Sequence, residues 1–268
     1  MAILLDPDAR PVVAHRGNSA HAPENTLESL RQGAKLGADA IEFDIRLSRD
    51  GHAIVIHDPT LERTTSGRGS VAGATLAELR TLDAGFHFTP DGGRTFPWRG
   101  RGLTVPTLDE VLAAFPATPM IIEIKTASAS VEARRLLLRH GATLRCVIGS
   151  FSDSALAPFR GSTFACGAAR RDVVHLYLRA LTPGGPARLP YQVLCIPPSF
   201  RGLPLPVQRF ARMAHRCGVP THVWTVDDPA RACRYWSGAV NAIISNDPAA
   251  ILAAAGRSCG RSSQQSLA

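Results

Sequence analysis

Residues 14–58 read AHRGNSAHAPENTLESLRQGAKLGADAIEFDIRLSRDGHAIVIHD. Within this stretch, residues 40–46 alternate between apolar and polar side chains, and a strand with this pattern places Glu42 and Asp44 on the same face. Two neighbouring carboxylates repel each other, so burying them together requires a cation or a shared proton. A hard divalent metal ion is the simplest such cation, and a solvated strand face that binds nothing is the alternative.

Two histidines follow short apolar segments in the same stretch. His15 follows residues 11–14 and His57 follows residues 53–56, so both imidazoles are expected where a strand gives way to a loop. A single histidine in such a place is usually a hydrogen-bonded structural residue. A pair beside two acids suits general acid and general base roles near neutral pH.

A second pair of charged residues shares a strand face further along the chain. Residues 121–125 read IIEIK, which predicts that Glu123 and Lys125 lie on one side of a strand. Glu123 can complete an oxygen-rich metal site, and Lys125 then lies within reach of a metal-bound phosphate. The alternative is an ordinary ion pair between the two side chains.

Together these residues resemble the signature of the glycerophosphodiester phosphodiesterase family. The order and spacing of the motifs carry the resemblance: His15-Arg16-Gly17, Pro23-Glu24-Asn25-Thr26, Glu42-Phe43-Asp44, Asp50-Gly51, His57-Asp58, Leu82-Asp83-Ala84-Gly85, Val105-Pro106-Thr107-Leu108-Asp109-Glu110, Ile122-Glu123-Ile124-Lys125 and Trp224-Thr225-Val226. The resemblance covers nearly the whole chain. It is specific for the family and leaves the substrate open.

The predicted fold is α/β, a TIM-type (β/α)8 barrel with a small capping insertion. We expect residues 1–256 to form a single catalytic barrel, residues 59–106 to form the insertion over its mouth, and residues 257–268 to be a mobile tail. The strand candidates number nine for eight barrel places, so one is an extra strand or the arm of a hairpin. These candidates are residues 11–14, 40–46, 53–56, 120–125, 146–151, 163–167, 193–196, 222–226 and 242–245.

The resemblance implies a metal-dependent phosphodiesterase that hydrolyses glycerophosphodiesters to sn-glycerol 3-phosphate and an alcohol. In this hypothesis one divalent cation, Mg2+ or Ca2+, is held by Glu42, Asp44 and Glu123. Residues His15 and His57 divide the proton transfers, and which of them is the acid stays open, as does attack by water or by the neighbouring glycerol hydroxyl. The expected substrate contacts are Arg16, Lys125 and Trp224.

Two other functions are weighed against this one. A lysophospholipase D-type hydrolase would use the same residues on a lipid with one acyl chain, and an apolar groove at the barrel mouth would favour it. A catalytically silent binding barrel is the other alternative, and it would not need every proposed residue to be present. The chain departs from the family at Asp227, where the family commonly has Asn, and at Asn241, where it tends to have Asp. We expect these departures to affect substrate contacts more than catalysis.

Composition narrows the class of protein. With 45% hydrophobic and 19% charged residues the chain can bury a large core, and no apolar run approaches the ~20 residues of a membrane helix. The start lacks a secretory signal, which favours a cytoplasmic location without stable membrane insertion. A net charge of +8 favours an anionic ligand, but the excess reads as spread along the chain, so nucleic acid is not an expected partner. The head group and the oligomeric state are not predicted.

Overall fold

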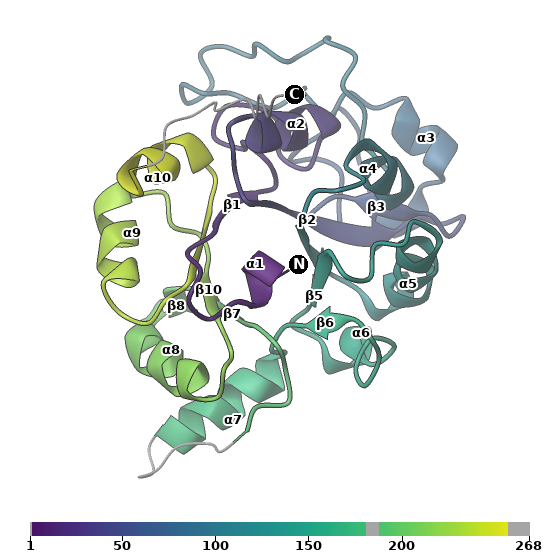
Figure 1. The fold of residues 1–268 in the computed structure, drawn as a ribbon. Coiled ribbons are helices and arrows are strands. Elements are labelled where there is room, and N and C mark those ends of the chain that lie inside the picture. The colour runs from purple at the N-terminus through teal and green to yellow at the C-terminus, as the bar shows by residue number, and fades with distance from the viewer. Residues whose placement is uncertain (1, 181–187, 257–268) are drawn as a thin grey trace, which may run out of the picture.

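The computed structural model describes residues 2–180 and 188–256, so the predicted tail 257–268 lies outside the described residues. Eight parallel strands form a ring surrounded by helices (Figure 1). Around the ring they are β6 (Ala165–Cys166), β5 (Cys146–Gly149), β4 (Met120–Ile124), β2 (Ala40–Leu47), β1 (Val12–His15), β11 (Ala242–Ser245), β10 (Thr221–Val223) and β7 (Leu194–Ile196). A parallel bridge between Gly167 and Val193 joins β6 to β7 and completes the circle. The predicted (β/α)8 barrel is confirmed.

Each barrel strand is followed by a helix that packs on the outside of the ring (Figure 1). These helices are α2 (Leu27–Lys35), α4 (Leu108–Ala114), α5 (Ser130–Arg139), α6 (Asp153–Leu156), α7 (Arg170–Ala180), α8 (Val207–Arg216), α9 (Pro229–Trp236) and α10 (Pro248–Ala254). Apolar side chains of strands and helices form the layer between them, because strands covered on both faces must be apolar outward as well as inward. None of the described helices is both long and apolar enough to cross a membrane.

The ninth strand candidate is the arm of a hairpin. Strand β3 (Ala53–Val55) pairs antiparallel with the end of β2, with Ile45 opposite Val55. The five residues between the two strands are too few for the helical crossover that a parallel pair needs, and Gly51 makes the turn with a φ of 84°. The hairpin carries the chain above the barrel mouth, where His57 follows.

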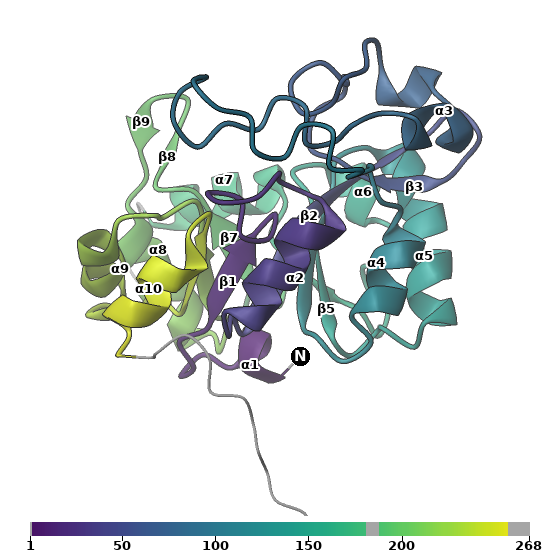
Figure 2. The same ribbon diagram turned by 90° about the horizontal axis from the view of Figure 1, so that it is seen from above.

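The segment between β3 and α4 lies over the end of the barrel at which the strands finish (Figure 2). It contains a 3-10 turn, η1 (Val71–Gly73), and a short helix, α3 (Leu76–Arg80), and is otherwise irregular. A small apolar cluster beneath it includes Ile54, Leu61 and Leu79, so this cap has a core of its own. The cap returns to the barrel at Thr107, which with Glu110 forms a capping box that begins α4.

The other end of the barrel is closed by α1 (Ala2–Leu5), which lies in the centre of the ring in Figure 1. Its Leu4 is fully buried among inward-facing residues of the strands, including Val13 and Ile121. The sequence offered no periodic pattern here, because one turn of helix is too short to show one. Two further elements complete the fold: the 3-10 turn η2 (Ala127–Ala129), and an antiparallel hairpin of β8 (Ser199–Phe200) and β9 (Leu203–Pro204).

We predict that Leu4→Ala destabilises the protein by about 2–4 kcal/mol, because it leaves a cavity in the barrel interior that the surrounding strands cannot close. Urea unfolding followed by circular dichroism measures the change. Leu144→Ala is the matched control, since Leu144 is 70% exposed and its truncation should change stability by less than about 0.5 kcal/mol. Equal midpoints for the two variants would show that α1 does not contribute to the core.

Candidate active site

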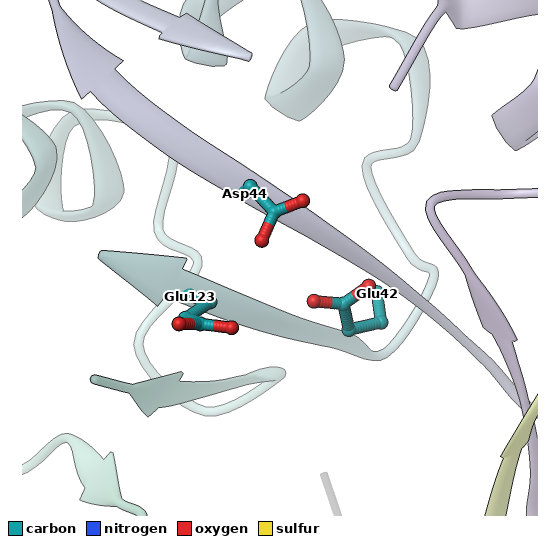
Figure 3. Close-up of side chains that lie close together, drawn as sticks. All are labelled: Glu42, Asp44 and Glu123. Atoms are coloured by element: carbon teal, nitrogen blue, oxygen red, sulfur yellow. The ribbon is translucent and has the colours of Figure 1, made fainter. Parts of the chain in front are cut away.

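Three carboxylates meet at the mouth of the barrel (Figure 3). Glu42 and Asp44 project from β2 and Glu123 from the neighbouring β4, where the parallel register sets Asp44 beside Glu123. One oxygen of each lies within 4.8 Å of one from the others. Glu42 and Asp44 are buried, and Glu123 is partly exposed. The predicted metal-binding set is therefore gathered in one place, with oxygen ligands that suit Mg2+ or Ca2+.

Two basic side chains offset part of this negative charge. The Lys125 Nζ atom lies 2.9 Å from Asp44 Oδ1 and 2.8 Å from Glu123 Oε1, and Arg16 Nε lies 3.1 Å from Asp44 Oδ2. Burial would raise the pKa of Asp44, but the charges of Lys125 and Arg16 overcome it and lower that pKa to about 2. Burial and the charge of Asp44 raise the pKa of Glu42 well above its usual value. The site is thus still short of positive charge, which a bound cation would supply.

The motifs of residues 15–17 and 23–26 form one loop that holds these groups in place. Gly17 has a φ of 88°, and a Cβ atom there would lie 2.3 Å from the backbone of Ser29, so only glycine allows this approach of the loop to α2. Asn25 clamps Asp44, donating from Nδ2 to Oδ2 at 2.9 Å and accepting from the Asp44 backbone N–H at 3.1 Å. Thr26 accepts from the Ser29 N–H and caps α2. Gly17, Asn25 and Thr26 therefore each have a structural role in this loop.

His15 ends β1 beside Glu42, and its Nδ1 lies 2.6 Å from Asn246 Oδ1. Asn246 is itself held by Asp227, whose oxygens accept from its backbone N–H at 2.7 Å and its Nδ2 at 2.8 Å. A carboxylate only accepts, so the amide must turn its Oδ1 toward His15, and His15 must carry its proton on Nδ1. Burial lowers the pKa of His15 to about 4, so it is neutral at pH 7 with a free lone pair on Nε2.

His57 has a different partner. Its Nδ1 lies 2.6 Å from Asp58 Oδ1, and its side chain is 33% exposed. Arg63, from the cap, donates to Asp58 at 2.5 Å and to Glu24 at 2.7 Å, and Glu24 accepts from Arg16 at 2.8 Å. One arginine of the cap therefore links the loops that carry both histidines.

Most of the predicted site residues border one pocket at the barrel mouth. Seven of the eight predicted site residues line it, and Asp44 lies directly behind them: the seven are His15, Arg16, Glu42, His57, Glu123, Lys125 and Trp224. The opposite wall is largely apolar and includes Phe151, Ala168 and Ile244. Trp224 belongs to this wall and meets the edge of Phe151, with 5.9 Å between the ring centroids. The pocket thus has a charged side and an apolar side.

Five supporting residues were not among the predicted site residues: Glu24, Asn25, Arg63, Asp227 and Asn246. The first two stand in a motif that the resemblance marked, but spacing alone does not reveal their partners. Neither Asp227 nor Asn241 lines the pocket, and the expectation that these departures affect substrate contacts stays a prediction. Asp227 acts on His15 instead, and Asn241 accepts from the Thr221 N–H at the far end of β10.

Comparisons with known proteins relate the whole barrel to one family. The sequence model of the glycerophosphoryl diester phosphodiesterase family matches residues 15–250. A glycerophosphodiester phosphodiesterase from Caldanaerobacter subterraneus subsp. tengcongensis is 30% identical over 256 residues, covering 90% of this chain and 96% of that protein.

Two solved structures extend the comparison to three dimensions. An Oleispira antarctica phosphodiesterase, in complex with the product sn-glycerol-3-phosphate, is 29% identical with a TM-score of 0.71, covering 92% of this chain and 97% of that one. A glycerophosphodiester phosphodiesterase from Agrobacterium tumefaciens is 27% identical with a TM-score of 0.70, covering 91% and 99%. The region that the family model matches, residues 15–250, contains every residue of the pocket.

We predict that Glu123→Gln weakens the binding of Mg2+ or Ca2+ at least about tenfold, because the amide keeps the shape of the side chain but removes one of three anionic ligands. Isothermal titration calorimetry of metal-stripped protein measures the affinity. Glu132→Gln, on α5 and paired with Arg135, is the matched control and should bind as the unchanged protein does. Unchanged affinity in Glu123→Gln would remove that residue from the metal site.

Proposed function

Because the chain belongs to the glycerophosphoryl diester phosphodiesterase family and is an enzyme of that class, we propose that it hydrolyses glycerophosphodiesters to sn-glycerol 3-phosphate and an alcohol, with a divalent cation. The observation that carries the proposal is the meeting of three carboxylates, two histidines and Lys125 at one pocket. The complex of the Oleispira antarctica relative with sn-glycerol-3-phosphate supports the product assigned here.

The carboxylates Glu42, Asp44 and Glu123 would hold the cation. Their oxygens are hard anionic donors, and the pKa of Glu42 is raised by its neighbour Asp44 and by burial, which fits a site built to receive positive charge. When bound, a divalent cation supplies Lewis-acid polarisation of the phosphoryl oxygens. Arg16 and Lys125 would neutralise the remaining charge of the phosphate. Their contacts with Asp44 keep both basic side chains in position.

The two histidines have partners that suit different roles. His15 is fixed by an amide oxygen with its proton on Nδ1, so its Nε2 lone pair is free to accept a proton from the nucleophile. The Nδ1 atom of His57 lies against the Asp58 carboxylate, which holds the ring in place for a proton transfer from Nε2 to the departing alkoxide. We therefore assign the base to His15 and the acid to His57. Trp224 would pack against the apolar part of the substrate.

A second candidate substrate follows from the apolar wall of the pocket. A lysophospholipid presents the same phosphodiester with one acyl chain, and the wall formed by Phe151, Ala168 and Trp224 offers apolar surface to it. This lysophospholipase D-type activity would use the same catalytic residues.

One experiment separates these possibilities. Metal-stripped protein is incubated with glycerophosphocholine, glycerophosphoethanolamine or a lysophospholipid, with Mg2+ or Ca2+ added separately, and released glycerol 3-phosphate and head group are measured. We expect metal-dependent release of glycerol 3-phosphate from the glycerophosphodiesters. Head group released from the lysophospholipid alone would favour the second candidate, and no turnover with either metal would contradict both.

We predict that His15→Ala and His57→Ala each lower kcat by about 10²–10⁴-fold, because each removes one positioned proton transfer. A glycerophosphodiester with a p-nitrophenyl leaving group distinguishes them, since p-nitrophenolate departs without protonation. His57→Ala should regain most of its activity on that substrate and His15→Ala should not. The reverse pattern would exchange the two assignments. His175→Ala, an exposed histidine on α7, is the control.

We also predict that Asn246→Ala lowers kcat by about 10–100-fold with little change in KM, because His15 then loses the acceptor that sets its tautomer. Asp227→Asn should act in the same direction, since an amide no longer forces the orientation of Asn246. The control is Asp228→Asn, which makes the same exchange at the neighbouring position, keeps an acceptor for the exposed cap of α9 and should leave kcat unchanged. Wild-type kcat in Asn246→Ala would show that this network is only structural.

A further inference from the structure

Most of the net positive charge of the chain comes from one segment. Residues 173–226 contain six arginines, no lysine and no acidic residue, so they carry +6 of the net charge of +8. The expectation that the excess is spread along the chain is therefore wrong. The arginines lie at positions 179, 188, 201, 209, 212 and 216, and the last four are exposed on the β8–β9 hairpin and α8.

Exposed apolar side chains gather in the same segment. Nine large hydrophobic side chains are exposed among the described residues, and five of them fall here: Val174, Tyr177, Leu178, Phe200 and Leu203. The first three lie on α7 and the other two face each other across the β8–β9 hairpin. Burying such side chains on folding is the ordinary outcome, so their clustering beside arginines marks a surface that is covered by something else.

The β8–β9 hairpin projects from the end of the barrel over which the cap lies (Figure 2). Both of its strands are exposed, and its turn, Arg201-Gly202, takes positive φ values of 51° and 80°. The ring of Phe200 lies between two guanidinium groups, with 5.3 Å to Arg170 and 5.7 Å to Arg201. Leu203 beside it is 71% exposed. The tip of the hairpin therefore presents two apolar side chains, Phe200 and Leu203, with the arginines Arg170 and Arg201 next to them.

The helices on either side continue this surface. Tyr177 of α7 meets Phe210 of α8 edge-on, with 6.1 Å between ring centroids, and the guanidinium of Arg209 donates to the carbonyl of Ala180 at the end of α7. Arg170, at the start of α7, reaches the hairpin through Phe200. We call α7, the β8–β9 hairpin and α8 the basic-apolar face.

We propose that the basic-apolar face docks the protein reversibly on a phospholipid surface that carries anionic head groups, with the tip of the β8–β9 hairpin entering the interface. Arginines attract an anionic surface, and exposed apolar side chains bury in the acyl boundary, so the two together give binding that neither gives alone. This inference goes beyond the proposed hydrolysis and does not depend on it.

Charge and side-chain type favour lipid over nucleic acid. Nucleic acids bind arginines and stacking aromatic rings, but Val174, Leu178 and Leu203 are aliphatic and offer nothing to a base or a phosphate. Aliphatic side chains do gain from transfer into the acyl boundary of a bilayer.

The test is co-sedimentation of the full chain with vesicles of phosphatidylcholine, with and without phosphatidylglycerol. We expect binding to the vesicles that contain phosphatidylglycerol, and its loss at about 1 M NaCl, where the Debye length falls to about 3 Å. Leu203→Glu should weaken this binding at least about tenfold, and so should Arg212→Glu combined with Arg216→Glu.

Leu144→Glu is the matched control, because Leu144 is 70% exposed but lies in the turn before β5, away from the basic-apolar face. It should bind vesicles as the unchanged protein does, and Leu203→Glu should still hydrolyse a soluble glycerophosphodiester at the unchanged rate, which shows that it folds. No binding to anionic vesicles, or equal binding by Leu203→Glu and Leu144→Glu, would overturn the proposal. Binding of a single-stranded oligonucleotide in place of vesicles would assign the face to nucleic acid and overturn it as well.

Discussion

The mutual repulsion of Glu42, Asp44 and Glu123 is the constraint on which the rest of this site depends. Their oxygens approach within 4.8 Å of one another in a partly buried place, where water screens them poorly. Contacts from the surrounding residues offset this repulsion. Lys125 contacts two of the carboxylates and Arg16 contacts Asp44. Asn25 holds Asp44 in one orientation. The close approach of the loop at Gly17 follows from the need to bring Arg16 and Asn25 to the same carboxylate.

Much of this arrangement could be predicted from the sequence, because strand periodicity is local. Alternation over residues 40–46 is enough to put Glu42 and Asp44 on one face, and the same rule relates Glu123 to Lys125. The barrel then follows from the number and length of the segments. The odd strand could not be identified from pattern alone, since β3 is as apolar as its neighbours, and only the short link before it indicated a hairpin.

Contacts between distant segments account for what the sequence did not predict. Asn246 reaches His15 from the opposite end of the chain, and nothing in the spacing of residues 241–247 distinguishes it from a simple helix cap. Arg63 lies in an irregular cap, where no period exists to be read, yet it joins Glu24 to Asp58. Such partners are set by how loops fold over the barrel, and loops obey turn chemistry that one sequence reveals only in part.

The reactive groups are concentrated on one half of the strand ring. Strands β1, β2 and β4 with the β3 hairpin carry the reactive groups, whereas the strands from β5 round to β11 contribute the apolar wall and the rim. Evolution can therefore vary the second half of the barrel to alter which alcohol is accepted, provided that Asp227 and Asn246 are kept to hold His15. Laboratory recombination between related enzymes can use the same division, with crossover points placed after β4 and with these two residues retained in the exchanged segment.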